Sequence, residues 1–332
     1  MKKILQYAIS LTIAGGLLWY VFKDIDLSTM VGQFKKANYW WIVVSGFAAI
    51  IAHLSRAVRW KMLMEPLGYN PSNFRTLLAV LIGYFANFIM PRMGEVSKCG
   101  SLQKTDNIPF EKSFGTVVAE RIFDLVSLLV LLALNLLLEF GRLKEFFVEQ
   151  FSEKIPLVIG ILVALPLLGF AGVYFFKKYQ DRLVQKSAFL KKVIHFMNGL
   201  LDGLLSIKKL KSPGLFIAYT VLIWVAYYFS AYVLFFSIPE TSHLGPLAGL
   251  TVLVIGSLGM AAPAQGGIGP FHFLVGNILV LYGLTKEAGI TLATFIHGSQ
   301  MLLLLFLGAI SFLITLFLKP KLRQKQRLVK AF

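Results

Sequence analysis

Long apolar segments alternate with short charged ones along the chain, a pattern typical of membrane helices. A helix needs about 20 apolar residues to cross the ~30 Å hydrocarbon core of a bilayer. The stretch from Ile4 to Phe22 qualifies, and because no small-x-small cleavage site follows it, we expect a retained span rather than a signal peptide. Further spans are expected at residues 39–55, 113–138, 156–176, 213–237 and 290–318. The pattern predicts an all-α polytopic bundle of about six full spans.

Two other apolar regions, residues 76–91 and 247–284, are interrupted by Gly and Pro. Lys and Arg accumulate on the cytoplasmic side, so the basic loop at 177–212 should be cytoplasmic, whereas the loops at 139–155 and 238–246 should lie outside. Counting spans between these loops requires segment 76–91 to enter the membrane from the cytoplasmic side and to return to the same side. The same count makes 247–284 either an external re-entrant hairpin or two tight spans. We expect two broken insertions of opposed orientation, surrounded by protein or a wet cavity.

The chain is expected to form one integral membrane domain, residues 1–318, in a cytoplasmic (inner) membrane with both termini cytoplasmic. The tail at 319–332 carries basic charges and no acid. Within 177–212, apolar residues recur at helical spacing among lysines, which predicts an amphipathic helix on the lipid headgroups. A solvated linker with a structural apolar stripe is the alternative.

Composition argues against several classes of protein. The chain is 57% hydrophobic and 15% charged, against roughly a quarter charged in soluble proteins, so a soluble enzyme is not expected. The net charge of +17 is explained by positive-inside loops and anionic lipids, without nucleic acid. The single cysteine, Cys99, excludes an intramolecular disulfide and a Cys-based zinc cage. Since hydrolase and nucleotide motifs are missing, we expect no metal and no cofactor.

Arg56 and Arg59 lie at the cytoplasmic end of the second span, beside His53 and Trp60. Their spacing places them within two helical turns, where guanidinium groups can hold a phosphate bidentately. Basic and aromatic residues at this depth also serve as interface anchors, so both roles stay open.

The first broken insertion ends in Asn87-Phe-Ile-Met-Pro91-Arg92-Met-Gly94-Glu95. Pro91 stops the helix and Gly94 permits a tight turn, so that Arg92 and Glu95 can face back toward the membrane and meet a polar headgroup. The alternative is an ordinary loop in which Arg92 and Glu95 neutralise each other.

Glu120, Arg121 and Asp124 form a third motif, which begins about 10 Å along a predicted helix starting at Ser113. Charges at such depth are costly and are usually functional or paired. Glu120 and Asp124 share a helix face, and Arg121 is expected to reach Asp124 three residues on. Two acids beside one arginine leave one negative charge in excess. An arginine of the two preceding motifs could be its partner. A purely structural salt-bridge cluster would use the same residues.

A Gly- and Pro-rich run in the second broken insertion cannot form a continuous helix. Free amides near the start of the next helix would favour an anionic group, and a bare hinge is the alternative. A histidine that follows could titrate near neutral pH or simply be hydrogen-bonded. The residues of this motif are Pro263, Gln265, Gly266, Gly267, Gly269 and His272.

Taken in this order, the four motifs resemble the lysylphosphatidylglycerol synthase transmembrane region, a family also described as flippase-like. The resemblance covers about residues 5–318. In the best-known member, the multiple peptide resistance factor, this region is associated with moving aminoacylated phosphatidylglycerol between leaflets, while a separate soluble domain transfers the amino acid from charged tRNA. Because this sequence shows no such domain, the resemblance implies the translocation half alone.

Two positions depart from the family pattern. Gln265 stands where the family often has Pro, and His272 stands where it often has Glu, which leaves the charge of the headgroup open. Some members resemble modules attached to glycosyltransferases, which keeps a polyprenyl-phosphate lipid among the options.

We therefore expect a stand-alone translocator of an anionic, aminoacylated or polyprenyl-phosphate lipid, with membrane lipids as its partners. The arginines named above would bind phosphate, the acids would balance their charge or meet an amine, and residues 263–269 would form a gate. A membrane-embedded lipid-modifying transferase, with Glu120 or Asp124 as base, is one alternative. A non-catalytic partner of a separately encoded lipid- or glycan-modifying enzyme is the other.

Overall fold

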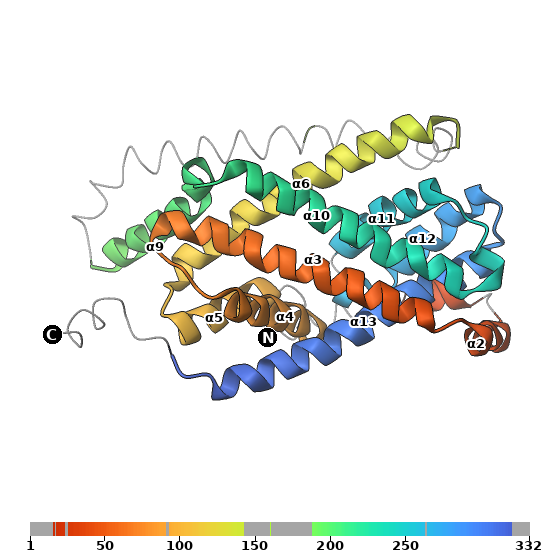
Figure 1. Ribbon diagram of the computed structural model, residues 1–332, viewed down its shortest axis with the longest axis horizontal. Coiled ribbons are helices and arrows are strands. Elements are labelled where there is room, and N and C mark those ends of the chain that lie inside the picture. The colour runs from red at the N-terminus through yellow and green to blue at the C-terminus, as the bar shows by residue number, and fades with distance from the viewer. Residues whose placement is uncertain are drawn as a thin grey trace.

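The computed structural model describes residues 16, 18–23, 26–90, 93–142, 160, 188–262 and 264–320. Within these ranges every regular element is a helix, which confirms the all-α fold (Figure 1). The longest helices run along the long axis of the molecule, and shorter helices pack between them toward each end. Of the expected spans at 4–22 and 156–176, the structure describes only residues 16, 18–22 and 160.

Four helices in the described part of the chain are long and apolar enough to cross a membrane. They lie at the predicted spans 39–55, 113–138, 213–237 and 290–318. They are α3 (Trp40–Met64), α6 (Phe110–Leu138), α10 (Pro213–Tyr232) and α13 (Lys286–Phe317). Many of their apolar side chains stay exposed, as lipid-facing helices require.

Side-chain hydrogen bonds fix the relative directions of these helices. Arg59, near the end of α3, donates to Thr220 near the start of α10 over 3.3 Å. Trp60 Nε1 donates to Thr116 near the start of α6 over 2.9 Å. Both α6 and α10 therefore begin where α3 ends, which agrees with the directions predicted from the span count.

The first hairpin consists of α4 (Asn73–Ile89) and α5 (Gly94–Asp106). At its open end, the Arg75 guanidinium donates to the Thr105 carbonyl. Near its tip the two backbones touch, because a Cβ added to Gly94 would lie 2.5 Å from the Gly83 oxygen. Gly94 is the first residue of α5 and does not have a positive φ, so no left-handed turn conformation requires glycine there. The close approach of two helices is what excludes a side chain there.

The second hairpin consists of α11 (Pro246–Ala261) and α12 (Pro270–Ile278), joined through a 3-10 turn (Gln265–Gly267). The backbone of Gly266, Gly267 and Gly269 has φ angles of 59°, 74° and 93°, which residues with a Cβ rarely adopt. The predicted break in this segment is confirmed. Pro263, like Pro91 and Arg92 of the first insertion, lies outside the described residues.

α13 runs past both hairpins. Near its start Gly289 packs on the backbone of Gly276 in α12, and near its end Gly308 packs on Phe85 in α4. The Arg75 guanidinium also donates to the Lys319 carbonyl, just beyond α13, over 2.9 Å. The hairpins therefore open toward opposite ends of the bundle (Figure 1). The insertion of the two segments into the membrane from opposite leaflets stays a prediction.

One end of the bundle gathers many lysines and arginines, and we call it the basic end. It is the end at which α3 and α13 finish and α4, α6 and α10 begin. Its basic residues include Lys61, Arg75, Lys104, Lys112, Lys208, Lys209, Lys211 and Lys319.

The described part of the predicted amphipathic connection is α9 (Ala188–Leu205). It packs against the start of α6, where a Cβ added to Gly203 would lie 2.4 Å from the Lys112 oxygen. The helix is confirmed for this half of the connection, whereas residues 177–187 lie outside the description. Its contact with lipid headgroups stays a prediction.

A short helix, α2 (Leu27–Lys36), lies at the opposite end of the bundle (Figure 1). Asp26 caps it, because its carboxylate accepts a hydrogen bond from the Ser28 amide over 2.8 Å. Hydrogen bonds from the side chains of Ser28 and Thr29 lower the pKa of Asp26 to about 2. The cap therefore stays ionised across the physiological pH range.

The close contact inside the first hairpin generates a stability prediction. Gly94→Ala should destabilise the protein by about 1–3 kcal/mol, because its Cβ would press on the Gly83 backbone oxygen as well as on the Asn87 side chain. Unfolding can be followed with a thiol-reactive fluorophore, since Cys99 is the chain's single cysteine and is fully buried. Gly100→Ala is the matched control on the same helix, because nothing lies within 4 Å of its added Cβ. Equal melting temperatures for the two variants would contradict the close packing.

Candidate functional site

Five charged side chains from three helices meet inside the bundle, and we call them the ionic cluster: Arg56, Arg59, Lys98, Glu120 and Asp124. The two arginines of α3 both hold Asp124 of α6, Arg56 Nη2 at 2.6 Å and Arg59 Nη2 at 2.5 Å. Lys98 of α5 holds Glu120 Oε2 at 2.7 Å. Helical spacing brings Arg56 and Arg59 to one face of α3 and Glu120 and Asp124 to one face of α6. The predicted partnership of these arginines with the α6 acids is thus present.

The cluster is almost completely removed from solvent. The side chains of Arg59 and Glu120 are 0% exposed, and those of the other three are nearly buried. Burying charge costs several kcal/mol per ion unless each one is paired and hydrogen-bonded. Removal of a single member should therefore be more damaging than the loss of a surface ion pair.

Lys98 was not predicted from the sequence. It lies in a polar segment after Glu95 that resembles an ordinary cytoplasmic loop, so its charge needed no buried partner. The structure places it in α5, where its ammonium also stands 4.4 Å from the centre of the Trp60 ring. Its spacing of three residues from Glu95, on a helical face, is the signal that could have revealed it.

A second ion pair joins the same two helices. Arg121 Nη2 of α6 lies 2.6 Å from Glu95 Oε1 of α5, with side chains 48% and 24% exposed. The prediction that Arg121 reaches Asp124 on its own helix is wrong. Asp124 lies on the buried face, where the α3 arginines occupy it, whereas Arg121 points about a quarter turn away toward α5. Glu95 therefore meets an arginine, but one from α6.

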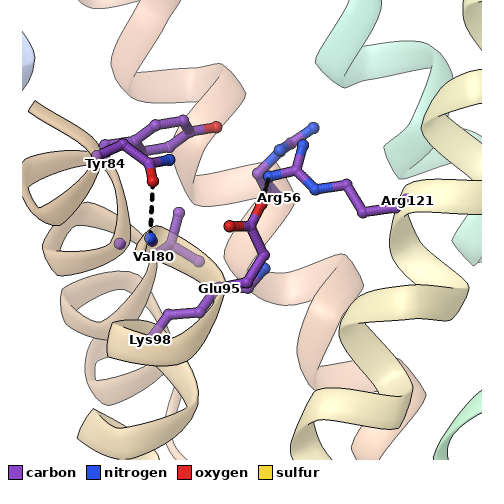
Figure 2. A pocket seen from close by; sticks show the side chains of 9 residues that line it. Arg56, Val80, Tyr84, Glu95, Lys98 and Arg121 are labelled. Atoms are coloured by element: carbon purple, nitrogen blue, oxygen red, sulfur yellow. Dashed lines mark hydrogen bonds and ion pairs between the residues drawn. The ribbon is translucent and has the colours of Figure 1, made fainter. Parts of the chain in front are cut away.

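A small pocket lies between the first hairpin and the helices that carry Arg56 and Arg121 (Figure 2). Its volume is about 20 Å³, roughly enough for one water molecule. Asn87 helps to shape its wall, since its Oδ1 accepts a hydrogen bond from the Gly94 amide over 2.7 Å. The lining residues are Arg56, Val80, Gly83, Tyr84, Asn87, Gly94, Glu95, Lys98 and Arg121.

Not every polar atom beside this pocket is satisfied. Arg56 Nε, Arg59 Nε and Glu120 Oε1 are buried and have no hydrogen-bond partner. Glu120 Oε1 lies 3.7 Å from Arg56 Nε and 3.6 Å from Arg59 Nη2, too far for a hydrogen bond. An unmade hydrogen bond to a buried polar group costs about 1–3 kcal/mol, more for a charged one. The arginines thus retain donor capacity for an incoming anion.

The loop of the second hairpin touches the tip of the first. Gln265 Nε2 donates to the Phe88 carbonyl in the last turn of α4. His272 packs instead against His297, with ring centres 5.0 Å apart, and His297 Nε2 lies 2.9 Å from the Gly266 oxygen. No described hydrogen bond or ion pair joins His272 to the ionic cluster. The structure therefore brings Gln265, but not His272, to the first hairpin.

The expected free amides of this loop are occupied. Gly267 N and Ile268 N donate to carbonyls within the loop, and Gly269 N donates to His272 Nδ1 over 3.4 Å. These three amides are therefore not available to an anion in this conformation. In the described residues no group of three metal-ligating side chains could hold a metal ion.

Comparisons with known proteins agree with this architecture. The family described as the lysylphosphatidylglycerol synthase TM region matches residues 7–308. The UPF0104 membrane protein MJ1595 of Methanocaldococcus jannaschii is 31% identical over 126 residues, 37% of this chain and 37% of the relative. The UPF0104 membrane protein PH1989 of Pyrococcus horikoshii is 30% identical over 141 residues, 41% of each chain.

A more distant match is the glycosyltransferase AglD of Haloferax volcanii, 24% identical over 124 residues, 35% of this chain and 20% of the relative. The matched stretches span less than half the length of each of these relatives. No solved structure matches the chain. Because the family match extends over most of the sequence, the chain is a membrane protein that belongs to the family of the lysylphosphatidylglycerol synthase transmembrane region.

Proposed function

We propose that this protein moves a phosphate-bearing lipid between the leaflets of the membrane, with the headgroup passing the ionic cluster. The observation that carries the proposal is the pocket beside the first hairpin, which three cations line: Arg56, Lys98 and Arg121. Guanidinium and ammonium groups are the usual partners of phosphate oxygens. The apolar helices around the pocket leave the acyl chains in lipid while the headgroup is inside.

The pocket is closed in this conformation, because about 20 Å³ cannot hold a phosphate group. Two ion pairs close it by holding α5 against α6, Lys98 with Glu120 and Arg121 with Glu95. Movement of the first hairpin away from α6 would open it. The phosphate oxygens would then replace the carboxylates as partners of the freed cations.

A lipid-modifying transferase is the less favoured alternative. Its base would have to be Glu120 or Asp124, and both carboxylates are held by cations at 2.7 Å or less. The similarity to AglD, a glycosyltransferase by name, supports instead a role beside a separately encoded glycan- or lipid-modifying enzyme. The translocated lipid would then be that enzyme's substrate or product.

Under this proposal the basic end faces the cytoplasm of an inner membrane, since Lys and Arg accumulate on that side. The first hairpin would enter from the cytoplasmic leaflet and the second from the outer one. Their tips meet where Gln265 binds the Phe88 carbonyl.

A test of translocation is the movement of fluorescently labelled phospholipids between leaflets in proteoliposomes. Arg56→Gln should reduce the rate about tenfold or more, because it removes a buried guanidinium that lines the pocket. Arg142→Gln is the matched control, since Arg142 forms a 3.5 Å pair with Glu139 at the other end of α6. Wild-type redistribution no faster than in protein-free vesicles, for every lipid tried, would reject the proposal.

The opening movement can be tested separately. In the variant with Glu95→Cys, Arg121→Cys and Cys99→Ala, a reducible bis-maleimide should tie α5 to α6 where their side chains meet. Translocation should stop when the link forms and return when it is reduced. A monofunctional maleimide on the same protein controls for the added bulk. Transport that continues at the same rate with the link in place would contradict hairpin movement.

A further inference from the structure

The charges around the pocket do not balance. Four cations, Arg56, Arg59, Lys98 and Arg121, stand with three acids, Glu95, Glu120 and Asp124, within two ion-paired groups that share the lining of one pocket. The described groups therefore carry one uncompensated positive charge.

The neighbouring polar residues do not supply the missing negative charge. His53 and Tyr227 pack near the cluster, and Tyr84 lines the pocket, but protonation of His53 would only add positive charge. The polar side chains at the loop of the second hairpin are Gln265, His272 and His297, none of them acidic. An uncompensated charge inside an apolar bundle is costly, so the site favours a partner of opposite sign.

The three acids of the site are also already engaged. Glu120 is held by Lys98, Asp124 by two arginines and Glu95 by Arg121. Glu120 Oε1 has no hydrogen bond, but it lies 3.7 Å from Arg56 Nε and 3.6 Å from Arg59 Nη2, so each of these three carboxylates has a cation within ion-pairing distance. An amine would therefore enter a site whose described charges already sum to +1, whereas a phosphate would reduce that charge and meet the Nε of Arg56, which has no hydrogen-bond partner.

We propose that the cargo is a lipid whose headgroup has a net charge of −1, a phosphodiester without a compensating amine. This inference rests on the proposed function and specifies the substrate class of the same pocket. Zwitterionic and aminoacylated headgroups are excluded by charge, not by size.

The test compares three labelled lipids in the same proteoliposomes: phosphatidylglycerol, phosphatidylethanolamine and lysyl-phosphatidylglycerol, with net charges near −1, 0 and +1. We expect phosphatidylglycerol to move about tenfold faster than the other two. A tenfold ratio corresponds to about 1.4 kcal/mol, which is less than the usual cost of placing like charges next to each other. Equal rates for phosphatidylglycerol and the lysyl lipid would overturn the inference while leaving translocation intact.

Charge variants then assign the preference to the cluster. Lys98→Met brings the net charge of the site to zero and should reduce the preference for phosphatidylglycerol. Lys98→Arg retains the charge and should retain the preference. Because the loss of a buried lysine can prevent folding, Glu95→Gln provides the opposite change at a partly exposed position. Glu95→Gln should raise the rate at which phosphatidic acid, which carries more negative charge, moves between leaflets relative to the rate for phosphatidylglycerol. An unchanged ratio in both directions would overturn the assignment.

A binding measurement separates this inference from the proposed function. Detergent-solubilised wild type should retain phosphatidylglycerol more tightly than the lysyl lipid, whether or not any lipid moves in vesicles. Absence of movement with this binding preference would reject translocation and keep the headgroup assignment. Displacement of the lipid by soluble glycerol phosphate would assign the pocket to a free anion and overturn the lipid assignment.

Discussion

Charge buried among apolar helices must be balanced where it lies, and this requirement ties the structure together. The acids of α6 need cations, and these come from two other helices, Arg56 and Arg59 of α3 and Lys98 of α5. Because acyl chains offer no partner for a charge, none of the three helices can leave without exposing an unpaired ion unless another charged group takes its place. The ionic cluster thus holds the first hairpin to the spanning helices.

The broken helices impose the second constraint. Backbone groups freed at a helix end have no water to bind within a bilayer, so they must find partners in the protein. The loop of the second hairpin satisfies Gly267, Ile268 and Gly269 internally, and its Gln265 serves the Phe88 carbonyl at the end of α4. The loop of the second hairpin therefore supplies a hydrogen-bond donor to the tip of the first. A movement of one hairpin that breaks this contact leaves a carbonyl of the other without its partner.

The sequence predicted the elements better than their contacts. Apolar length identified the four described spans, Gly and Pro identified both breaks, and loop charge gave the relative directions of the helices. The pairing of Arg56 and Arg59 with the α6 acids followed because buried charge demands a partner. Lys98 and the pairing of Arg121 with Glu95 could not be found in this way. Periodicity tells which residues share a face of one helix, but not which helix that face meets.

The same distinction explains the glycines. Gly94 looked like a turn residue in the sequence, because glycine after proline is common in turns. Only the structure shows that its missing side chain allows α5 to approach Gly83 of α4. That approach matters for the site, because it sets Glu95 and Lys98, one and four residues later, at the height of Arg121 and Glu120. The geometry of the pocket therefore depends on a contact between two backbones, and a bulkier residue at position 94 would displace both ion pairs together.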